Sequence, residues 1–261
     1  MSIGSVHRSL ARGLELLETI SDAPDGATLS ELVAITGFDK SSVSRLVTTL
    51  SDLGYVVRLP DRRIVLTGRV LRLTHGFQAQ FDLQKLARPL LTEFRDRVGE
   101  SIVLTIREGN FSVSIDQLDP EQTFRMVPHI GNIAPLDATA AGRSMLFALA
   151  PPEQQRVLEA IKNEPIEHPE VRLDPRKLRS EVELVRRQGY VWIKRTDDVE
   201  RVSAVVLDMV GAPLAAVSVY GPKYRMQGRI DELGRECKRV ADALSVLARG
   251  HRARDRRITS A

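Results

Sequence analysis

The sequence predicts an α+β fold of two domains. The first is small and helical and ends in a β-hairpin, and the second is an antiparallel sheet flanked by helices. Apolar residues recur at helical spacing from Val6 to Leu53, and two short β-rich runs then flank the turn sequence Pro60-Asp61-Arg62. From Ser101 onward, strands and helices are mixed without the strict alternation that a parallel sheet requires.

Length and composition describe an ordinary globular protein. The 261 residues suffice for two domains with cores of their own, and 43% are hydrophobic and 28% charged. No run approaches the roughly 18 to 20 apolar residues of a membrane span, and the N-terminus lacks the apolar core of a secretory signal. Cys237 is the only cysteine, so no internal disulfide can form, which favours a reducing, cytoplasmic setting.

The net charge of +4 and the pI of about 9.4 permit binding to nucleic acid without demonstrating it. Part of the excess lies in residues 251–261, a basic tail that we expect to be disordered and to add a weak phosphate contact.

Three helices are expected in the first domain. Val6–Ile20 would pack behind two shorter helices, of which the first is capped by Thr28 and ends at Gly37, because glycine tolerates the left-handed conformation after a helix. Asp39 can cap the second, whose apolar stripe runs from Val43 to Leu53. This is a helix-turn-helix, a unit whose second helix enters the major groove of DNA.

The outer face of that second helix carries small hydroxyl residues and two cations but no acid, which suits an anionic, hydrogen-bonding surface. The candidate DNA-reading residues are Lys40, Ser41, Ser42, Ser44, Arg45, Thr48 and Thr49. The alternative is a small helical core with an ordinary solvated face.

A β-wing follows, formed by Tyr55–Leu59 and Arg63–Leu66, in which Arg58, Arg62 and Arg63 are candidate phosphate contacts. Residues 1–67 are therefore predicted to be a winged helix-turn-helix DNA-binding domain.

Residues 68–82 are predicted to be a linker helix, a common place for dimer packing. The next helix, Leu83–Val98, contains Pro89, so we expect a kink or a restart near Arg88.

The second domain is expected to span residues 83–250. The predicted strands are Ile102–Ile106, Val113–Leu118, Phe124–Ile130, Tyr190–Ile193, Ser203–Leu207 and Pro213–Val219. The predicted helices are Thr139–Leu149, Glu153–Lys162, Pro175–Gln188 and Ile230–Ala248.

Five stretches, in the right order, resemble the IclR family of transcriptional regulators over nearly the full length. They are SVHRSLARGLELLE (5–18), LSELVAITGFDKSSVSRLVTTLSDLGYV (29–56), GNIAPLDATAAGRSMLFAL (131–149), RRQGYV (186–191) and PLAAVSVYGPKYRM (213–226). The resemblance implies a GAF-like effector-binding domain, a homodimer or homotetramer, double-stranded operator DNA as partner and a small organic effector.

In this family the ligand lies in a cup between segments that match Pro135–Gly142 and Ala215–Tyr220. The residues that the resemblance implicates are Leu136, Asp137, Thr139 and Ala140 on the first wall and Ser218 and Tyr220 on the second. Helix capping by Thr139 and strand packing by Ser218 are the alternatives.

The chain departs from the family pattern at three places. Asp137 stands where histidine is common, Tyr220 where a small residue or serine is common, and KRTDDVERV, with Arg201, replaces the usual acidic pair and glycine. A pocket narrowed by Tyr220 and edged by Arg201 would suit a carboxylate, including one on an aromatic ring, because arginine binds carboxylates bidentately. Arg201 could equally be a surface charge at a strand end.

Trp192 could line this pocket or belong to the core. The five histidines show no metal-ligand spacing, and no nucleotide or nucleophile motif is present, so we expect no metal, no cofactor and no enzyme activity.

These features favour a ligand-responsive transcriptional regulator. One alternative is an enzyme or degenerate sensor whose C-terminal domain acts on or binds a small acid without DNA regulation. Another is an adaptor whose winged helix binds protein, and salt dependence would separate that from DNA binding.

Overall fold

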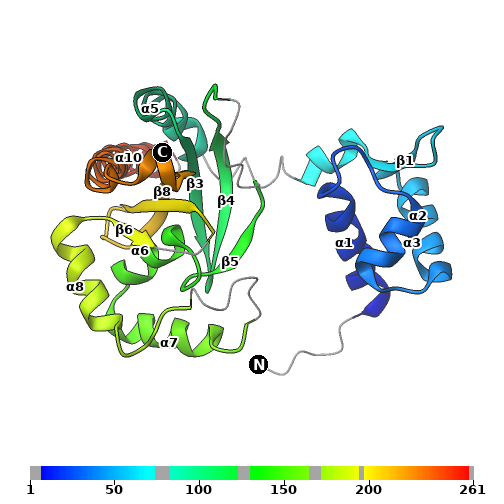
Figure 1. Cartoon of the computed structure of the whole chain (residues 1–261), viewed down its shortest axis with the longest axis horizontal. Helices are drawn as coiled ribbons and strands as arrows, with labels where there is room; N and C mark the ends of the chain where they lie inside the picture. The colour runs from blue at the N-terminus through cyan, green and yellow to red at the C-terminus, as the bar shows by residue number, and fades with distance from the viewer. Residues whose placement is uncertain (1–6, 74–82, 123–129, 165–171, 194–196, 259–261) are drawn as a thin grey trace. The chain divides into compact units, whose positions relative to one another are not determined.

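A computed structural model describes residues 7–73, 83–122, 130–164, 172–193 and 197–258. The chain divides into two compact units, Met1–Phe81 and Asp82–Ala261 (Figure 1). Within the described residues, no helix is both long and apolar enough to cross a membrane.

The first unit is a winged helix-turn-helix, as predicted. It contains the helices α1 (Arg8–Ser21), α2 (Leu29–Thr36) and α3 (Lys40–Asp52), the antiparallel strands β1 (Val56–Arg58) and β2 (Ile64–Leu66), and the short 3-10 helix η1 (Gly68–Val70). Residues 71–73 are helical, and the rest of the expected linker helix lies outside the described residues. The core of the first unit contains the buried side chains of Leu16, Ile20, Leu32, Val43 and Ile64.

The helix ends form as their sequences predict. The Thr28 hydroxyl accepts a hydrogen bond from the Glu31 backbone at 3.3 Å, and the Glu31 carboxylate accepts one from the Thr28 backbone at 2.7 Å. Gly37 ends α2 with φ 67°, and Asp39 caps α3 by accepting from the Ser42 backbone at 2.8 Å. These local contacts fix the short turn between α2 and α3.

The apolar stripe expected along the whole of α1 is buried only in its C-terminal half. Leu10 and Leu14 are 64% and 51% exposed, whereas Leu16 and Ile20 are buried. Since α2 has only eight residues, it is too short to cover the full length of α1.

The second unit is an antiparallel sheet of six strands in the order β5-β4-β3-β8-β7-β6. Its strands are β3 (Ser101–Glu108), β4 (Phe111–Leu118), β5 (Ile133–Pro135), β6 (Val191–Ile193), β7 (Val199–Leu207) and β8 (Pro213–Pro222). Its helices are α5 (Leu83–Val98), α6 (Ala140–Ala148), α7 (Pro151–Ile161), α8 (Leu178–Gln188), α9 (Lys223–Met226) and α10 (Ile230–Ile258).

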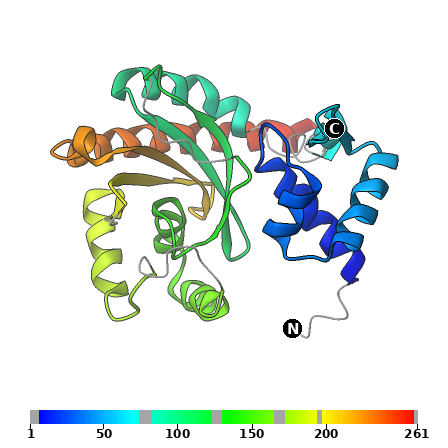
Figure 2. The same cartoon turned by 45° about the vertical axis from the view of Figure 1, so that its right-hand side comes forward.

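Helices cover both faces of the sheet, α5 and α10 on one and α6 on the other, with α7 and α8 beyond α6 (Figure 2). On the α6 side, Leu136, Met145 and Leu146 pack with Ala216 of β8 and Val191 of β6 in one core. We call the surface of the sheet that faces α6 the α6 face.

Several expectations about the second unit need correction. Of the kink or restart expected near Arg88, the restart does not occur: α5 runs through Pro89, with Leu83, Ala87, Leu91 and Phe94 buried on both sides of the proline. The sequence reading missed the short elements β5 and α9. The strand expected at Phe124–Ile130 lies outside the described residues except for Ile130, which is in a turn.

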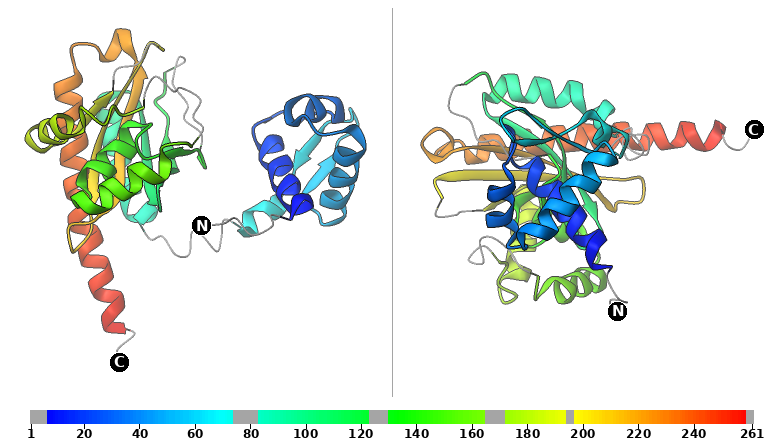
Figure 3. Two further views of the ribbon diagram at one scale, coloured as in Figure 1. Left: turned by 90° about the horizontal axis from the view of Figure 1, so that it is seen from below. Right: turned by 90° about the vertical axis from the view of Figure 1, so that its right-hand side faces the viewer.

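The last helix is longer than expected. α10 continues to Ile258, so residues 251–258, predicted to be a disordered tail, are helical (Figure 3). Arginine, a strong helix former, supplies half of this stretch, and no proline interrupts it.

Candidate DNA-binding surface and effector site

The exposed face of α3 carries positive charge. Lys40 and Arg45 are exposed, and neither has a carboxylate partner among the described residues. The Ser41 hydroxyl donates to Asp39 at 2.6 Å, and those of Thr48 and Thr49 donate to helix carbonyls one turn back at 3.0 Å. These three hydroxyl hydrogens are therefore used by the helix and its cap, while the two cations remain available.

Asp39 is the one acid at this end of α3. Its carboxylate accepts hydrogen bonds from Ser41 and Ser42, which hold the pKa of that carboxyl well below its usual range. The acid thus serves as the cap of α3.

The three arginines of the wing differ in their surroundings. Arg58 and Arg62 are exposed and have no carboxylate partner among the described residues, and Arg62 has a left-handed φ of 68°. Arg63 instead donates from Nη1 to the Gly26 carbonyl at 2.6 Å and lies 3.8 Å from Glu31 and 3.9 Å from Asp61. Arg63 therefore braces the wing against the loop before α2, a role that its sequence position did not reveal.

Two further arginines of the first unit lie over aromatic rings. The guanidinium of Arg12 in α1 lies 4.8 Å from the centre of Phe38 in the turn before α3, and that of Arg69 lies 5.5 Å from the centre of Tyr55. Sequence reasoning missed both, because each contact joins residues that are distant along the chain.

The segment before α6, proposed as the first wall of the effector cup, is a buried structural corner. Leu136 and Ala140 are fully buried in the core. Asp137 is 4% exposed, with its carboxylate 3.2 Å from Arg172, and its carbonyl accepts from Arg143 at 2.8 Å. Thr139 caps α6 by accepting from the Gly142 backbone at 2.9 Å.

Burial lowers the pKa of Arg143, and the neighbouring carboxylates of Glu181 and Asp137 oppose that effect. The corner is thus held by a set of buried, mutually compensating charges.

A chain of buried hydroxyls links the sheet to α6. Ser218 donates to Ser203 at 2.9 Å, Ser203 donates to the Val217 carbonyl at 3.1 Å, and the Ser144 oxygen in α6 lies 3.4 Å from that of Ser203. Ser218 was predicted as a site residue. Its partners were not identified, although Ser203 was expected to begin a strand.

The strand register places Arg201 and Tyr220 beside this chain. Ser203 pairs with Ser218, and two residues further on Arg201 pairs with Tyr220. Because side chains two apart in a strand share a face, Arg201 and Tyr220 lie on the α6 face with the two serines. The sequence-predicted residues Arg201, Ser218 and Tyr220 are thus brought together.

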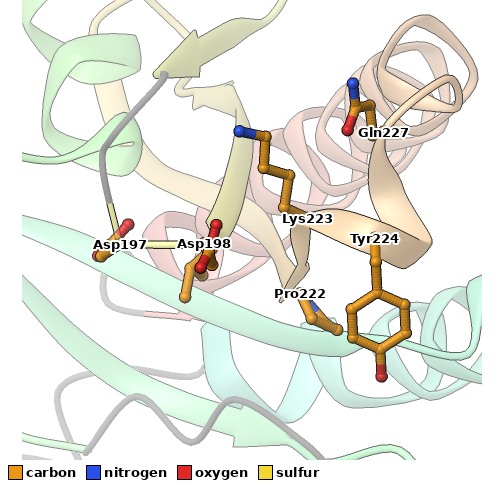
Figure 4. A pocket seen from close by; sticks show the side chains of 7 residues that line it. Asp197, Asp198, Pro222, Lys223, Tyr224 and Gln227 are labelled. Atoms are coloured by element: carbon orange, nitrogen blue, oxygen red, sulfur yellow. The ribbon is translucent and has the colours of Figure 1, made fainter.

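Arg201 already has a carboxylate partner. Its Nη1 and Nη2 donate to the two oxygens of Asp197 at 3.0 and 2.6 Å, and Nη1 also donates to the Val199 carbonyl at 2.8 Å. Two residues further along the strands, Val199 pairs with Pro222, and both help to line a hollow of about 510 Å³. Figure 4 shows Asp197 and Asp198 on one side of this hollow, with Lys223 and Gln227 across from them.

Trp192 does not join this group. It pairs with Val202, which is on the opposite face of the sheet, and its Nε1 donates to the Glu200 carboxylate at 2.6 Å. Its neighbours Val191 and Ile193 point to the α6 side, so strand alternation turns Trp192 away from Ser218. Trp192 instead borders a second hollow, of about 490 Å³, beside α6, α8 and β6.

Comparison with known proteins decides the family. Residues 76–246 match the model of the bacterial transcriptional regulator IclR C-terminal domain, and residues 9–60 match the IclR helix-turn-helix domain. This chain belongs to the IclR family.

Relatives and solved structures of the IclR family match nearly the whole chain. The transcriptional regulator KipR of Bacillus subtilis is 28% identical over 251 residues, which cover 93% of this chain and 96% of KipR. The regulator Rv1719 of Mycobacterium tuberculosis is 31% identical over 227 residues, 86% of each chain. An IclR homologue of Microbacterium hydrocarbonoxydans, solved in complex with 4-hydroxybenzoate, has the same fold, with a TM-score of 0.71, 22% identity and coverage of 91% of this chain and 98% of that one.

The sequence-based resemblance to the IclR family is therefore confirmed. This IclR-family chain is a transcriptional regulator with a helix-turn-helix DNA-binding domain and a C-terminal effector domain.

Proposed function

We propose that this regulator binds operator DNA through α3 and the wing of two copies, and that it responds to a small organic carboxylate that binds on the α6 face of the sheet. The observation that carries the effector part is the row of Ser203, Ser218, Tyr220 and Arg201, which the strand register brings to one face. The row joins hydroxyl groups to a guanidinium across two adjacent strands.

This row suits an acid with a polar group at its far end. The guanidinium of Arg201 can receive a carboxylate, and Tyr220 and the serine hydroxyls can receive a ring and its hydroxyl group. The 4-hydroxybenzoate bound by the Microbacterium homologue has this chemistry, which supports an aromatic acid as the first class to test. Leu136, Asp137, Thr139 and Ala140 then serve as the rigid support of the site.

On the DNA side, we assign base reading to the exposed face of α3. Arg45 and Lys40 supply its positive charge, and the hydroxyl residues Ser41, Ser42, Ser44, Thr48 and Thr49 allow close approach. Arg58 and Arg62 in the wing contact phosphates. Two half-sites on one face of the duplex would then lie about 34 Å, or a multiple of it, apart.

A homodimer or homotetramer is part of the proposal, because two half-sites need two DNA-binding units. Leu10, Leu14, Leu71 and Leu73 in the first unit are each more than half exposed and offer apolar surface for pairing. The effector must bind one arrangement of the oligomer better than the other, since a ligand with equal affinity for both shifts nothing.

Thermal unfolding of the full chain against a panel of benzoates, other carboxylic acids and their amides tests the effector class. A ligand that binds only the folded state raises the unfolding midpoint. At 100 times its dissociation constant, it adds about 2.7 kcal/mol to the free energy of unfolding. We expect a shift with an acid but not with its amide, and a change in operator affinity with the same acid. A panel in which amides and acids act alike would contradict the carboxylate assignment.

A further inference from the structure

Within the proposed effector row, Arg201 is already bound to a carboxylate. Asp197 presents both of its oxygens to the Nη1 and Nη2 groups of Arg201, the arrangement with which arginine also receives a free carboxylate. The pair is largely shielded from water, since the side chains of Arg201 and Asp197 are 12% and 30% exposed. A ligand carboxylate and Asp197 would therefore compete for the same edge of the guanidinium.

The backbone between the two residues holds this contact. Asp198 has a left-handed φ of 49°, which few residues other than glycine adopt, and its carbonyl accepts a hydrogen bond from the Lys223 backbone at 2.8 Å. Asp198 thus fixes the backbone directly after Asp197, which both lines the hollow in Figure 4 and accepts hydrogen bonds from Arg201.

We propose that Asp197 is a specificity-determining residue that acts as an internal substitute for the effector carboxylate, which binds Arg201 by displacing it. This inference rests on the proposed function of Arg201. Exchanging one carboxylate for another gains little by itself, so an acid must bring further contacts with Tyr220 and the serines in order to bind. Asp197 thereby rejects small acids such as acetate and favours larger ones.

The test uses the full-length chain, with 4-hydroxybenzoate, benzoate and acetate as acidic probes and benzamide as the neutral probe, all at one ionic strength. Binding is measured by calorimetry and by thermal unfolding. Asp197→Asn keeps the shape of the side chain but gives Arg201 a neutral partner, and we expect at least one acid to bind about tenfold tighter than to the wild type. Benzamide affinity should stay within about twofold.

Asp198→Asn is the matched control. It removes the same charge from the same hollow, but Asp198 makes no ion pair with Arg201 among the described residues. A general electrostatic effect would act alike in both variants, whereas displacement predicts the gain only in Asp197→Asn. In the double variant Asp197→Asn with Arg201→Gln, the gain in acid affinity should disappear.

Each outcome decides the matter. Equal or weaker acid binding by Asp197→Asn would mean that Asp197 orients Arg201 instead of competing for it, and a gain that survives Arg201→Gln would remove Arg201 from the explanation. Either result overturns the inference while leaving acid sensing by the wild type intact. If neither the wild type nor Asp197→Asn binds any of the acids, the proposed effector class fails and the inference that rests on it fails as well. A second variant, Asp197→Ser, guards against a folding defect peculiar to one substitution.

Discussion

At the residue scale, Arg45 provides the sharpest test of base reading. It projects from the exposed face of α3, and no acid among the described residues engages it. If it contacts a base edge, Arg45→Ala should lower operator affinity by about 1–3 kcal/mol while affinity for random DNA falls much less. Gel-shift titrations against both DNAs measure the ratio.

Arg58→Ala in the wing is the control for Arg45, because a phosphate contact should be lost equally on operator and random DNA. An equal loss in Arg45→Ala would reassign Arg45 to the same positioning role.

We expect Arg62 to raise the DNA affinity of the first unit while lowering its stability. Its φ of 68° is a conformation that glycine adopts at no steric cost. Arg62→Gly should therefore stabilise the first unit by about 1 kcal/mol in thermal unfolding. The same change should lower DNA affinity and reduce the slope of log affinity against log salt by about 1. Arg58→Gly, in strand β1, should lower both the stability of the first unit and its affinity for DNA. If Arg62→Gly also lowered both, the predicted gain in stability would be wrong.

Arg62 and Arg63 also show how far sequence reasoning reaches at this scale. The two residues are adjacent and chemically identical, and both were predicted to contact phosphates. Only the structure distinguishes their roles, because Arg63 donates to the carbonyl of Gly26, which is 37 residues away in sequence. A contact of that range leaves no local signal, whereas the caps at Thr28 and Asp39 act over three residues and were predicted.

At the element scale, two helical glycines have opposite surroundings. A Cβ at Gly13 in α1 would meet only Leu46, at an ordinary 3.9 Å, whereas one at Gly234 in α10 would lie 2.5 Å from the ring of Tyr190. Gly13→Ala should therefore stabilise the protein by about 1 kcal/mol through helix propensity. Gly234→Ala should destabilise it by about 1–3 kcal/mol through overpacking.

Thermal unfolding of both glycine variants is the measurement. A rise in the midpoint for Gly234→Ala would mean that Tyr190 does not pack tightly against α10.

The contact between Tyr190 and α10 also predicts a pH dependence. Burial, together with the hydrogen bond that Tyr190 donates to Asp231 at 2.6 Å, raises the pKa of Tyr190 to about 12. Because the folded pKa exceeds the unfolded value near 10, this stabilisation is fully present below pH 10 and is lost as pH rises towards 12.

The wild type should thus lose about 2 kcal/mol more than Tyr190→Phe between pH 10 and 12. Chemical denaturation at several pH values measures the difference, and parallel curves for the two proteins would contradict the assigned pKa.

The elements that sequence reasoning missed share a physical cause. α9 has only four residues and β5 three, too few for a periodic pattern.

α5 continues through Pro89 because tertiary burial of its stripe outweighs the lost hydrogen bond. Longer elements with clear periodicity, such as α3, β3 and β4, were predicted close to their observed bounds.

At the scale of the whole molecule, effector sensing and DNA binding should be separable, because the residues proposed for each belong to different units. Ser218→Ala combined with Tyr220→Ala should abolish the response to an effector while operator affinity stays within about twofold of the wild type. Calorimetry and gel shifts of one preparation test both parts. Unchanged effector affinity in the double variant would move the site away from the α6 face.

Because the chain has a single cysteine, its conformational changes can be followed with dyes attached to introduced cysteines. Cys237 is fully buried in α10 against β7, and burial raises the pKa of its thiol, so that little reactive thiolate forms near neutral pH. Thiol-reactive dyes should therefore ignore the native chain. A cysteine introduced at an exposed position of the wing and another on the surface of the second unit could be labelled in the native background, and energy transfer between the two dyes would follow an effector-driven rearrangement directly.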